Sequence, residues 1–233
     1  MKGQDVFLLL KLICLERMNS GQILEQYSNP ELTGWIDGGV INKLFNEDNL
    51  IFSDEEQQLN KIELVFNAEE DFKHLFTVRG LSNALGISKS EISKSLNRCL
   101  AVHLVKINRI NKRPEVNKKA FFEFIQYGLR YVFPVKPAEI TRGIPTTFSA
   151  PVLNKKLLSA GDLKMVWPDS RGKEMGQSIS PIYKSVPFAV RKDSELYSYL
   201  ALLDAIRIGN VRESNLALKI FSEKLFNESK HVQ

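Results

Sequence analysis

The sequence predicts a mainly α-helical protein with a small β wing, which places it in the α+β class. Two observations carry this prediction. Apolar residues recur at helical spacing on both sides of Gly86, a residue that takes positive φ without steric cost. A basic turn at 108–114 then separates two short β-prone segments, 104–107 and the stretch around Val116. Helix, turn, helix and hairpin therefore follow one another in a single continuous stretch, around which the rest of the chain is expected to be organised.

Length and composition limit the class of protein and the number of domains. The 233 residues are 43% hydrophobic and 25% charged with a net charge of +5, which is typical of a globular chain with room for two compact units. We expect a winged helix-turn-helix domain at 1–131, with an acidic insertion at about 20–76, and a loop-rich lobe at 132–233 closed by a helical hairpin. No stretch approaches the ~20 apolar residues of a membrane span, and Glu16 and Arg17 stand where a signal peptide needs its cleavage site. The expected location is cytoplasmic.

The first element is an apolar helix from Asp5 to Glu16. Its apolar residues cover both sides, so it is expected to be buried nearly all round. The insertion that follows carries twelve acidic residues against three lysines, a local net charge of −9. Such a segment could mask a neighbouring basic face until a signal moves it, because opposite charges favour the closed state. An ordinary solvated insertion is the competing interpretation.

The helix-turn-helix prediction depends on local signals. Leu81, Ala84 and Leu85 give the first helix its apolar stripe, and Ser88 with Glu91 has the spacing of a capping box, in which the hydroxyl and the carboxylate satisfy free amides. A second helix is therefore predicted from Ser88 to His103. Its predicted inward face consists of Ile92, Leu96, Cys99, Leu100 and His103.

The opposite face of that helix carries short hydrogen-bonding side chains and cations. Residues of this kind can reach base edges and phosphates when a helix lies in the major groove of DNA. Residues 77–119 also contain ten cations against two acidic residues, a local net charge of +8, which suits phosphate contacts. Any solvated amphipathic helix has a polar face, but the order of the elements favours DNA binding. The candidate DNA-binding residues are Ser88, Lys89, Ser90, Ser93, Lys94, Asn97 and Arg98 on the helix, and Arg109, Lys112 and Arg113 in the basic turn.

The C-terminal half begins with a predicted helix at 118–131, capped by Asn117 and apolar enough to join the two halves through a shared core. Residues 132–193 are rich in Pro, Gly and Ser, which predicts loops and short extended pieces rather than long helices. A helix capped by Asp193, running through Arg207 and stopped by Gly209, should pair with a last helix at 211–226, to close the domain or to form a dimer. A hydroxyl, a guanidinium and open backbone amides could form an anion or ligand pocket, with structural packing as the competing interpretation. The candidate pocket residues are Thr141, Arg142, Gly143 and Thr146.

The sequence lacks the common catalytic signatures. No segment matches a P-loop, a dinucleotide fingerprint, H-E-x-x-H or a nucleophile elbow. Cys14 and Cys99 fall on predicted apolar faces, which indicates buried free thiols, and two cysteines with three scattered histidines do not suggest zinc. We expect no enzyme, no metal and no cofactor, although a nuclease site built from distant carboxylates would escape this reasoning.

The segment Thr77–Val116, with LSNALGISKSEISKSLNRCLAVHLVK, resembles the winged helix-turn-helix of MarR-type bacterial transcription regulators, and KGQDVFLLLKLICLE resembles their first helix. The resemblance implies sequence-specific binding to duplex DNA, commonly as a homodimer. It places Ser90, Ser93, Lys94 and Asn97 toward the groove and Arg109, Lys112 and Arg113 at the wing. The C-terminal half, with GLRYVFP, TRGIPT and VWPD, resembles a little-characterised group of bacterial winged-helix proteins that implies no biochemical role.

These observations favour a bacterial repressor that acts as a homodimer on a palindromic operator. One alternative is an antitoxin-like or phage-defence operon component, in which the winged helix and the C-terminal lobe dock a partner protein. Another is a nuclease or an accessory factor of a nucleic-acid enzyme. The local charge of +8 favours nucleic-acid binding, but it does not distinguish a regulator from a nuclease, because both contact phosphates.

Overall fold

The computed structural model describes residues 1–19, 74–154 and 164–226, so nearly all of the acidic insertion, and the masking hypothesis based on it, lie outside the described residues. The N-terminal half contains α1 (Gly3–Asn19), α4 (Val78–Leu85), α5 (Lys89–Ala101), β1 (Val105–Ile107), β2 (Pro114–Val116), α6 (Lys118–Tyr127) and α7 (Leu129–Val132). The C-terminal half contains β3 (Ile140–Pro145), a 3-10 turn η1 (Thr147–Ser149), α8 (Pro151–Asn154), β4 (Met165–Pro168), β5 (Glu174–Ser178), α9 (Val186–Val190), α10 (Ser194–Ile208) and α11 (Val211–Phe226). The fold is a mixture of helices and two small sheets, consistent with the predicted α+β class.

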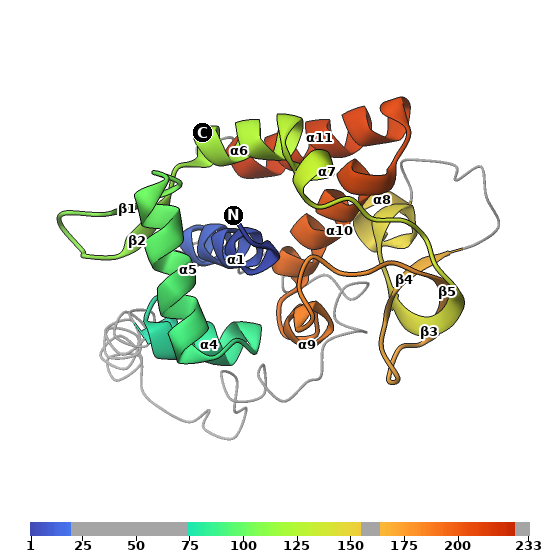
Figure 1. Cartoon of the computed structure of the whole chain (residues 1–233), viewed down its shortest axis with the longest axis horizontal. Coiled ribbons are helices and arrows are strands. Elements are labelled where there is room, and N and C mark those ends of the chain that lie inside the picture. The colour runs from blue at the N-terminus through green and yellow to red at the C-terminus, as the bar shows by residue number, and fades with distance from the viewer. Residues whose placement is uncertain (20–73, 155–163, 227–233) are drawn as a thin grey trace, which may run out of the picture.

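Helix α1 lies at the centre of the molecule, between α4 and α5 on one side and α10 on the other (Figure 1). The side chains at 6–10 and 12–15 are at most 1% exposed, which confirms a first helix buried nearly all round. A helix with apolar side chains on every face is stable only where neighbours cover each face. Here the two halves of the chain supply those neighbours.

The predicted helix–turn–helix–hairpin order is present. Thr77 and Ser88 cap α4 and α5 by accepting hydrogen bonds from backbone amides, and β1 pairs antiparallel with β2 from Val105 opposite Val116 to Ile107 opposite Pro114. Asn117 then caps α6 through the amide of Ala120. The caps at Ser88 and Asn117 fall at the residues that the sequence indicated, whereas the cap at Thr77 was not predicted.

The helix predicted at 118–131 is divided in two. Helix α6 ends at Tyr127 and α7 begins at Leu129, with Gly128 between them. Glycine is the poorest helix former after proline because it loses the most backbone freedom, so the break falls at that residue. Tyr131, the last residue of the predicted helix, is 82% exposed and therefore lies outside the shared core predicted for that helix.

The predicted loop region contains a second small sheet that sequence analysis missed. Strand β3 pairs antiparallel with both β4 and β5, and β4 pairs in parallel with β5, so the three strands close on themselves. Ile144 stands opposite Trp167, and Arg142 stands opposite Met175. The closed sheet lies beside α10 (Figure 1) and is joined to it by hydrogen bonds at Tyr197 and Asp204.

Helix α10 is the second central helix. Asp193 caps it and Gly209 ends it, as predicted. The side chains from Glu195 to Arg207 are buried, apart from the half-buried Ser198, so α10 is covered on nearly every side. Helix α11 forms the predicted hairpin with α10, with Ile220 and Phe221 turned inward. The apolar core is continuous across the predicted domain boundary at 131/132.

One buried polar cluster fixes the closed sheet to α10. The Asp204 carboxylate accepts hydrogen bonds from Trp167 Nε1 at 2.6 Å and Thr146 Oγ1 at 3.2 Å, and it pairs with Arg207 at 2.6 Å. Burial raises the pKa of Asp204, although Arg207 and the other donors oppose that shift. The Tyr197 hydroxyl adds a hydrogen bond to the carbonyl of Pro145.

Candidate nucleic-acid interface

The turn between α4 and α5 has the geometry that its sequence dictates. Gly86 ends α4 in the left-handed region, with φ of 64° and ψ of 34°, and its amide donates to the carbonyl of Ser82. The Ser82 hydroxyl donates to the carbonyl of Ile87 at 2.6 Å, so the turn is closed from both sides. Helix α5 then begins with the Ser88 hydroxyl accepting from the amide of Glu91 at 3.4 Å.

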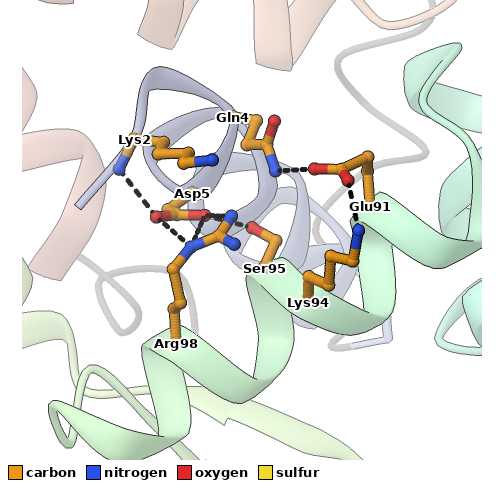
Figure 2. Close-up of polar contacts among 7 residues, drawn as sticks. All are labelled: Lys2, Gln4, Asp5, Glu91, Lys94, Ser95 and Arg98. Atoms are coloured by element: carbon orange, nitrogen blue, oxygen red, sulfur yellow. Dashed lines mark hydrogen bonds and ion pairs between the residues drawn. The ribbon is translucent and has the colours of Figure 1, made fainter.

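The predicted capping box is only half formed. Instead of bonding the Ser88 amide, the Glu91 carboxylate accepts from Gln4 Nε2 at 2.9 Å and from Lys94 Nζ at 3.0 Å (Figure 2). The carboxylate is drawn away because α1 presents a donor beside it. These hydrogen bonds lower the pKa of Glu91, with the bond from Gln4 as the largest cause.

The two faces of α5 separate largely as predicted. Ile92 and Cys99 are buried, whereas the outer positions are exposed except for the half-buried Ser93 and the half-buried Arg98 at the margin. The exposed outer positions are Lys89, Ser90, Lys94, Asn97 and Ala101. The prediction for His103 was wrong: α5 ends at Ala101, and His103 lies beyond it, exposed, with φ of 58°.

Asp5 and Arg98 form an ion pair between α1 and α5 (Figure 2). The Asp5 side chain is 1% exposed and accepts from Ser95 Oγ at 2.5 Å, from Arg98 Nη2 at 2.6 Å and from the amide of Lys2 at 2.7 Å. Burial acts to raise the pKa of Asp5, but the hydrogen bonds from Arg98, Ser95 and the Lys2 amide bring it below its ordinary value. The guanidinium that sequence analysis assigned to DNA therefore holds α5 on α1.

The hairpin between β1 and β2 is ordered by its asparagines. Asn108 Oδ1 accepts from the amides of Ile110 at 2.8 Å and Asn111 at 3.3 Å, and Asn108 Nδ2 donates to Glu115. Lys112 takes a left-handed conformation with φ of 57°. The candidate cations Arg109 and Lys112 are exposed, so they project from a turn with a defined backbone.

The third hairpin cation, Arg113, is half-buried. Its guanidinium carbon lies 5.0 Å from the centre of the Phe76 ring, beside a hollow with a volume of about 770 Å³. Glu16 lines the same hollow and ties α1 to the hairpin by accepting from the amide of Val116 at 2.9 Å. Burial raises the pKa of Glu16. Arg113 thus has a packing role in addition to its predicted role at the wing.

The predicted anion pocket is not assembled. Thr146 is buried and its hydroxyl is used by Asp204, whereas Arg142 is exposed and donates to the carbonyl of Gly172 at 3.3 Å. Gly143 is in close contact with the carbonyl of Trp167, and Thr141 is half-buried on β3. These groups have separate partners because β3 is a paired strand rather than an open loop.

The two thiols are free and buried, as predicted. Burial raises the pKa of Cys99 to about 12 and that of Cys14 well above its ordinary range. In the described part of the chain, no group of three or more His, Cys, Asp and Glu side chains is placed to hold a metal ion. Within the same ranges, no helix combines the length and the apolar character that crossing a membrane requires.

Sequence reasoning missed Gln4, Asp5 and Ser95, which orient α5 on α1. One signal was available. Ser95 lies three residues after Ile92 and four before Cys99, so it belongs to the inward face, and a buried hydroxyl needs a polar partner. A comparison of the chain with protein-family models, curated proteins and solved structures found no match.

Proposed function

We propose that the chain binds duplex DNA sequence-specifically as a winged-helix transcription regulator, with α5 as its recognition helix and the β1–β2 hairpin as its wing. The observation that carries this proposal is the exposure of Ser90, Lys94 and Asn97 on the outer face of α5, while the inner face is packed on α1 and α4. A recognition helix needs such a face, held rigidly from behind.

The proposed roles follow from side-chain chemistry. Asn97 has a carboxamide that can make two hydrogen bonds to an adenine edge, and Ser90 can donate to or accept from either kind of base pair. Lys89 and Lys94 at α5, with Arg109 and Lys112 at the hairpin, supply phosphate contacts that position the protein without reading sequence. We further propose a cytoplasmic repressor that acts as a homodimer, because two copies related by a two-fold axis would read a palindromic operator.

The test begins with selection of bound duplexes from a randomised pool by the purified protein, followed by affinity measurements on the selected duplex and on a variant with one altered base pair. Asn97→Ala should reduce the discrimination between these two duplexes by about tenfold, since one good base contact is worth about 1–3 kcal/mol. Gln126→Ala is the matched control, because it removes an exposed carboxamide on α6.

The wing is tested with Lys112→Ala. This change should weaken binding to both duplexes equally and make the slope of log K against log[salt] shallower by about 0.9, the value for one lost phosphate contact. Lys136→Ala removes another exposed lysine and should leave the slope unchanged. Equal effects of Asn97→Ala and Lys112→Ala on discrimination would refute the assigned roles, and a pool with no enriched sequence would refute sequence-specific binding.

Docking of a partner protein is the second candidate function. It is favoured by Tyr127 and Tyr131, which are 68% and 82% exposed on consecutive turns of α6 and α7, next to the exposed Val132. Exposed aromatic side chains of this kind are enriched at protein interfaces. A Tyr127→Gln, Tyr131→Gln variant that loses a co-eluting partner, combined with absent duplex binding by the unaltered protein, would support this candidate over DNA binding.

A further inference from the structure

Helix α9, from the C-terminal half, packs against the turn between α4 and α5 (Figure 1). The Ser185 hydroxyl, at the start of α9, donates to the carbonyl of Leu85 at 2.6 Å. The Phe188 ring lies against Gly86, so close that a Cβ added to Gly86 would be 2.9 Å from Phe188 Cδ1. The turn that introduces the proposed recognition helix is therefore covered by a segment about one hundred residues further along the chain.

Two exposed lysines flank α9. Lys184 precedes Ser185, and Lys192 follows the helix with its Nζ 3.9 Å from the centre of the Phe188 ring. Among the described residues, neither lysine forms an ion pair. Lys89, the first residue of α5, is exposed on the other side of the turn. Cations from both halves of the chain thus gather around one turn.

Three carboxylates of this neighbourhood, within the described part of the chain, already have cationic partners. Asp169 pairs with Arg191 at 2.9 Å, and Asp193 pairs with Lys11 at 2.8 Å. Glu91 pairs with Lys94 at 3.0 Å. The charges of the lysines around the turn are therefore available to an external anion.

We propose that Lys184 and Lys192, together with Lys89, form a second phosphate-contacting surface that extends DNA binding from α5 onto the C-terminal half. The proposal rests on the proposed function. In helix-turn-helix complexes the recognition helix enters the groove by its N-terminal residues while the preceding helix crosses the backbone. A segment packed on the turn between those helices then lies over the phosphates that border the groove. Contacts of this kind add affinity and register but carry no sequence information.

The experiment measures binding of the full chain to a fluorescein-labelled random-sequence duplex, and to the selected duplex, over a series of salt concentrations. The test variant is Lys184→Gln, Lys192→Gln. Loss of two phosphate contacts should make the slope of log K against log[salt] shallower by about 1.8. Affinity for both duplexes should fall by the same factor, about 60-fold at 0.1 M salt for that change in slope, with their ratio unchanged. The matched control is Lys136→Gln, Lys219→Gln, which removes the same charge from exposed positions on other elements.

The outcomes separate this proposal from the one on which it rests. An unaltered protein that binds the selected duplex, with a test variant whose slope and affinity match it, would overturn the α9 surface and leave the proposed function standing. An equal loss in the control variant would also overturn it, because net charge alone would then explain the effect. Failure of the unaltered protein to bind any duplex would overturn both. Thermal unfolding of each variant checks that the fold is retained.

Discussion

Replacing Asp5 with Asn tests whether the contact between α1 and α5 stabilises the fold as the structure indicates. The substitution keeps the shape of the side chain and removes its charge. In the native protein the carboxylate receives donors from the Ser95 hydroxyl, the Arg98 guanidinium and the backbone amide of Lys2. An asparagine offers a single acceptor oxygen, and its NH2 group would face donors that have no acceptor.

The expected loss of stability follows from the burial of the Asp5 and Arg98 side chains. Asp5 is 1% exposed, and removing one partner of a fully buried ion pair costs about 3–5 kcal/mol. The Arg98 side chain is 32% exposed, so water can solvate part of the guanidinium once the carboxylate is gone. Hydrogen bonds to charged groups are worth about 1.5–3 kcal/mol each. We expect Asp5→Asn to lower the free energy of unfolding by about 3 kcal/mol, at the lower end of the range for buried pairs.

The assay is urea denaturation followed by circular dichroism. Glu123→Gln, on the exposed side of α6, removes a carboxylate without a resolved partner and should change stability by no more than about 0.5 kcal/mol. A double-mutant cycle with Arg98→Met isolates the pairwise contribution. A loss below about 1 kcal/mol for Asp5→Asn, or additive effects in the cycle, would refute the reasoning.

The pH dependence of stability gives an independent check on the contribution of the Asp5 carboxylate. The pKa of Asp5 is lowered in the folded state, so its stabilisation is present above the unfolded pKa of about 3.9 and is lost as the pH falls through the folded pKa. The stability difference between the unaltered protein and Asp5→Asn should therefore be constant near neutral pH and shrink below about pH 4. A difference that persists undiminished at about pH 2 would show that charge is not its source.

Three further predictions concern other parts of the fold. Gly86→Ala should destabilise the protein by about 1–2 kcal/mol, because φ of 64° disfavours any Cβ and Phe188 occupies the space, as thermal unfolding would show. Asp204→Ala should cost about 3–5 kcal/mol in urea denaturation by leaving a buried guanidinium unpaired, and an unchanged midpoint would contradict the cluster described above. Cys14 and Cys99 should react with a thiol-specific disulfide reagent only after unfolding, because burial raises the pKa of both thiols, and rapid labelling of the native protein would contradict their burial.

Much of the helical framework could be predicted because its signals are local. Thr77, Ser88, Asn117 and Asp193 each cap a helix with their own side chains, and these caps lie within three residues of the amides that they satisfy. Gly86 alone predicts the turn, since few other residues accept its left-handed backbone conformation. The placement of α4, α5 and the β1–β2 hairpin therefore needed no knowledge of the rest of the fold.

The closed sheet of β3, β4 and β5 could not be predicted, because its strands contain the residues that usually end strands. Pro145 and Pro168 stand at strand ends, and Gly143 lies within β3. Gly143 is required there because a side chain would collide with the carbonyl of Trp167, a residue far away in the sequence. Such a requirement is visible only after the strands have been paired.

In the candidate site, too, features set by local sequence could be predicted, whereas features set by distant residues could not. The exposure of Asn97 and Lys94 follows from helical periodicity, which is local. The ion pair between Arg98 and Asp5 does not follow from periodicity, because 93 residues separate the two partners. A cation on a helix margin can serve a nucleic acid or a buried carboxylate, and periodicity does not distinguish them.

The position of α1 links the proposed recognition helix to the C-terminal half. One end of α1 holds α5 through Asp5 and Arg98, while Lys11, less than two turns away, is buried against Asp193 at the start of α10. A single helix thus carries an ion pair to each half of the chain. Residues 1–131 taken alone would leave Lys11 without the Asp193 carboxylate and would expose the apolar side of α1 that packs on α10. We therefore expect the C-terminal half to help hold α5, the proposed recognition helix, in place, so that changes at α10 would alter the proposed DNA binding from a distance.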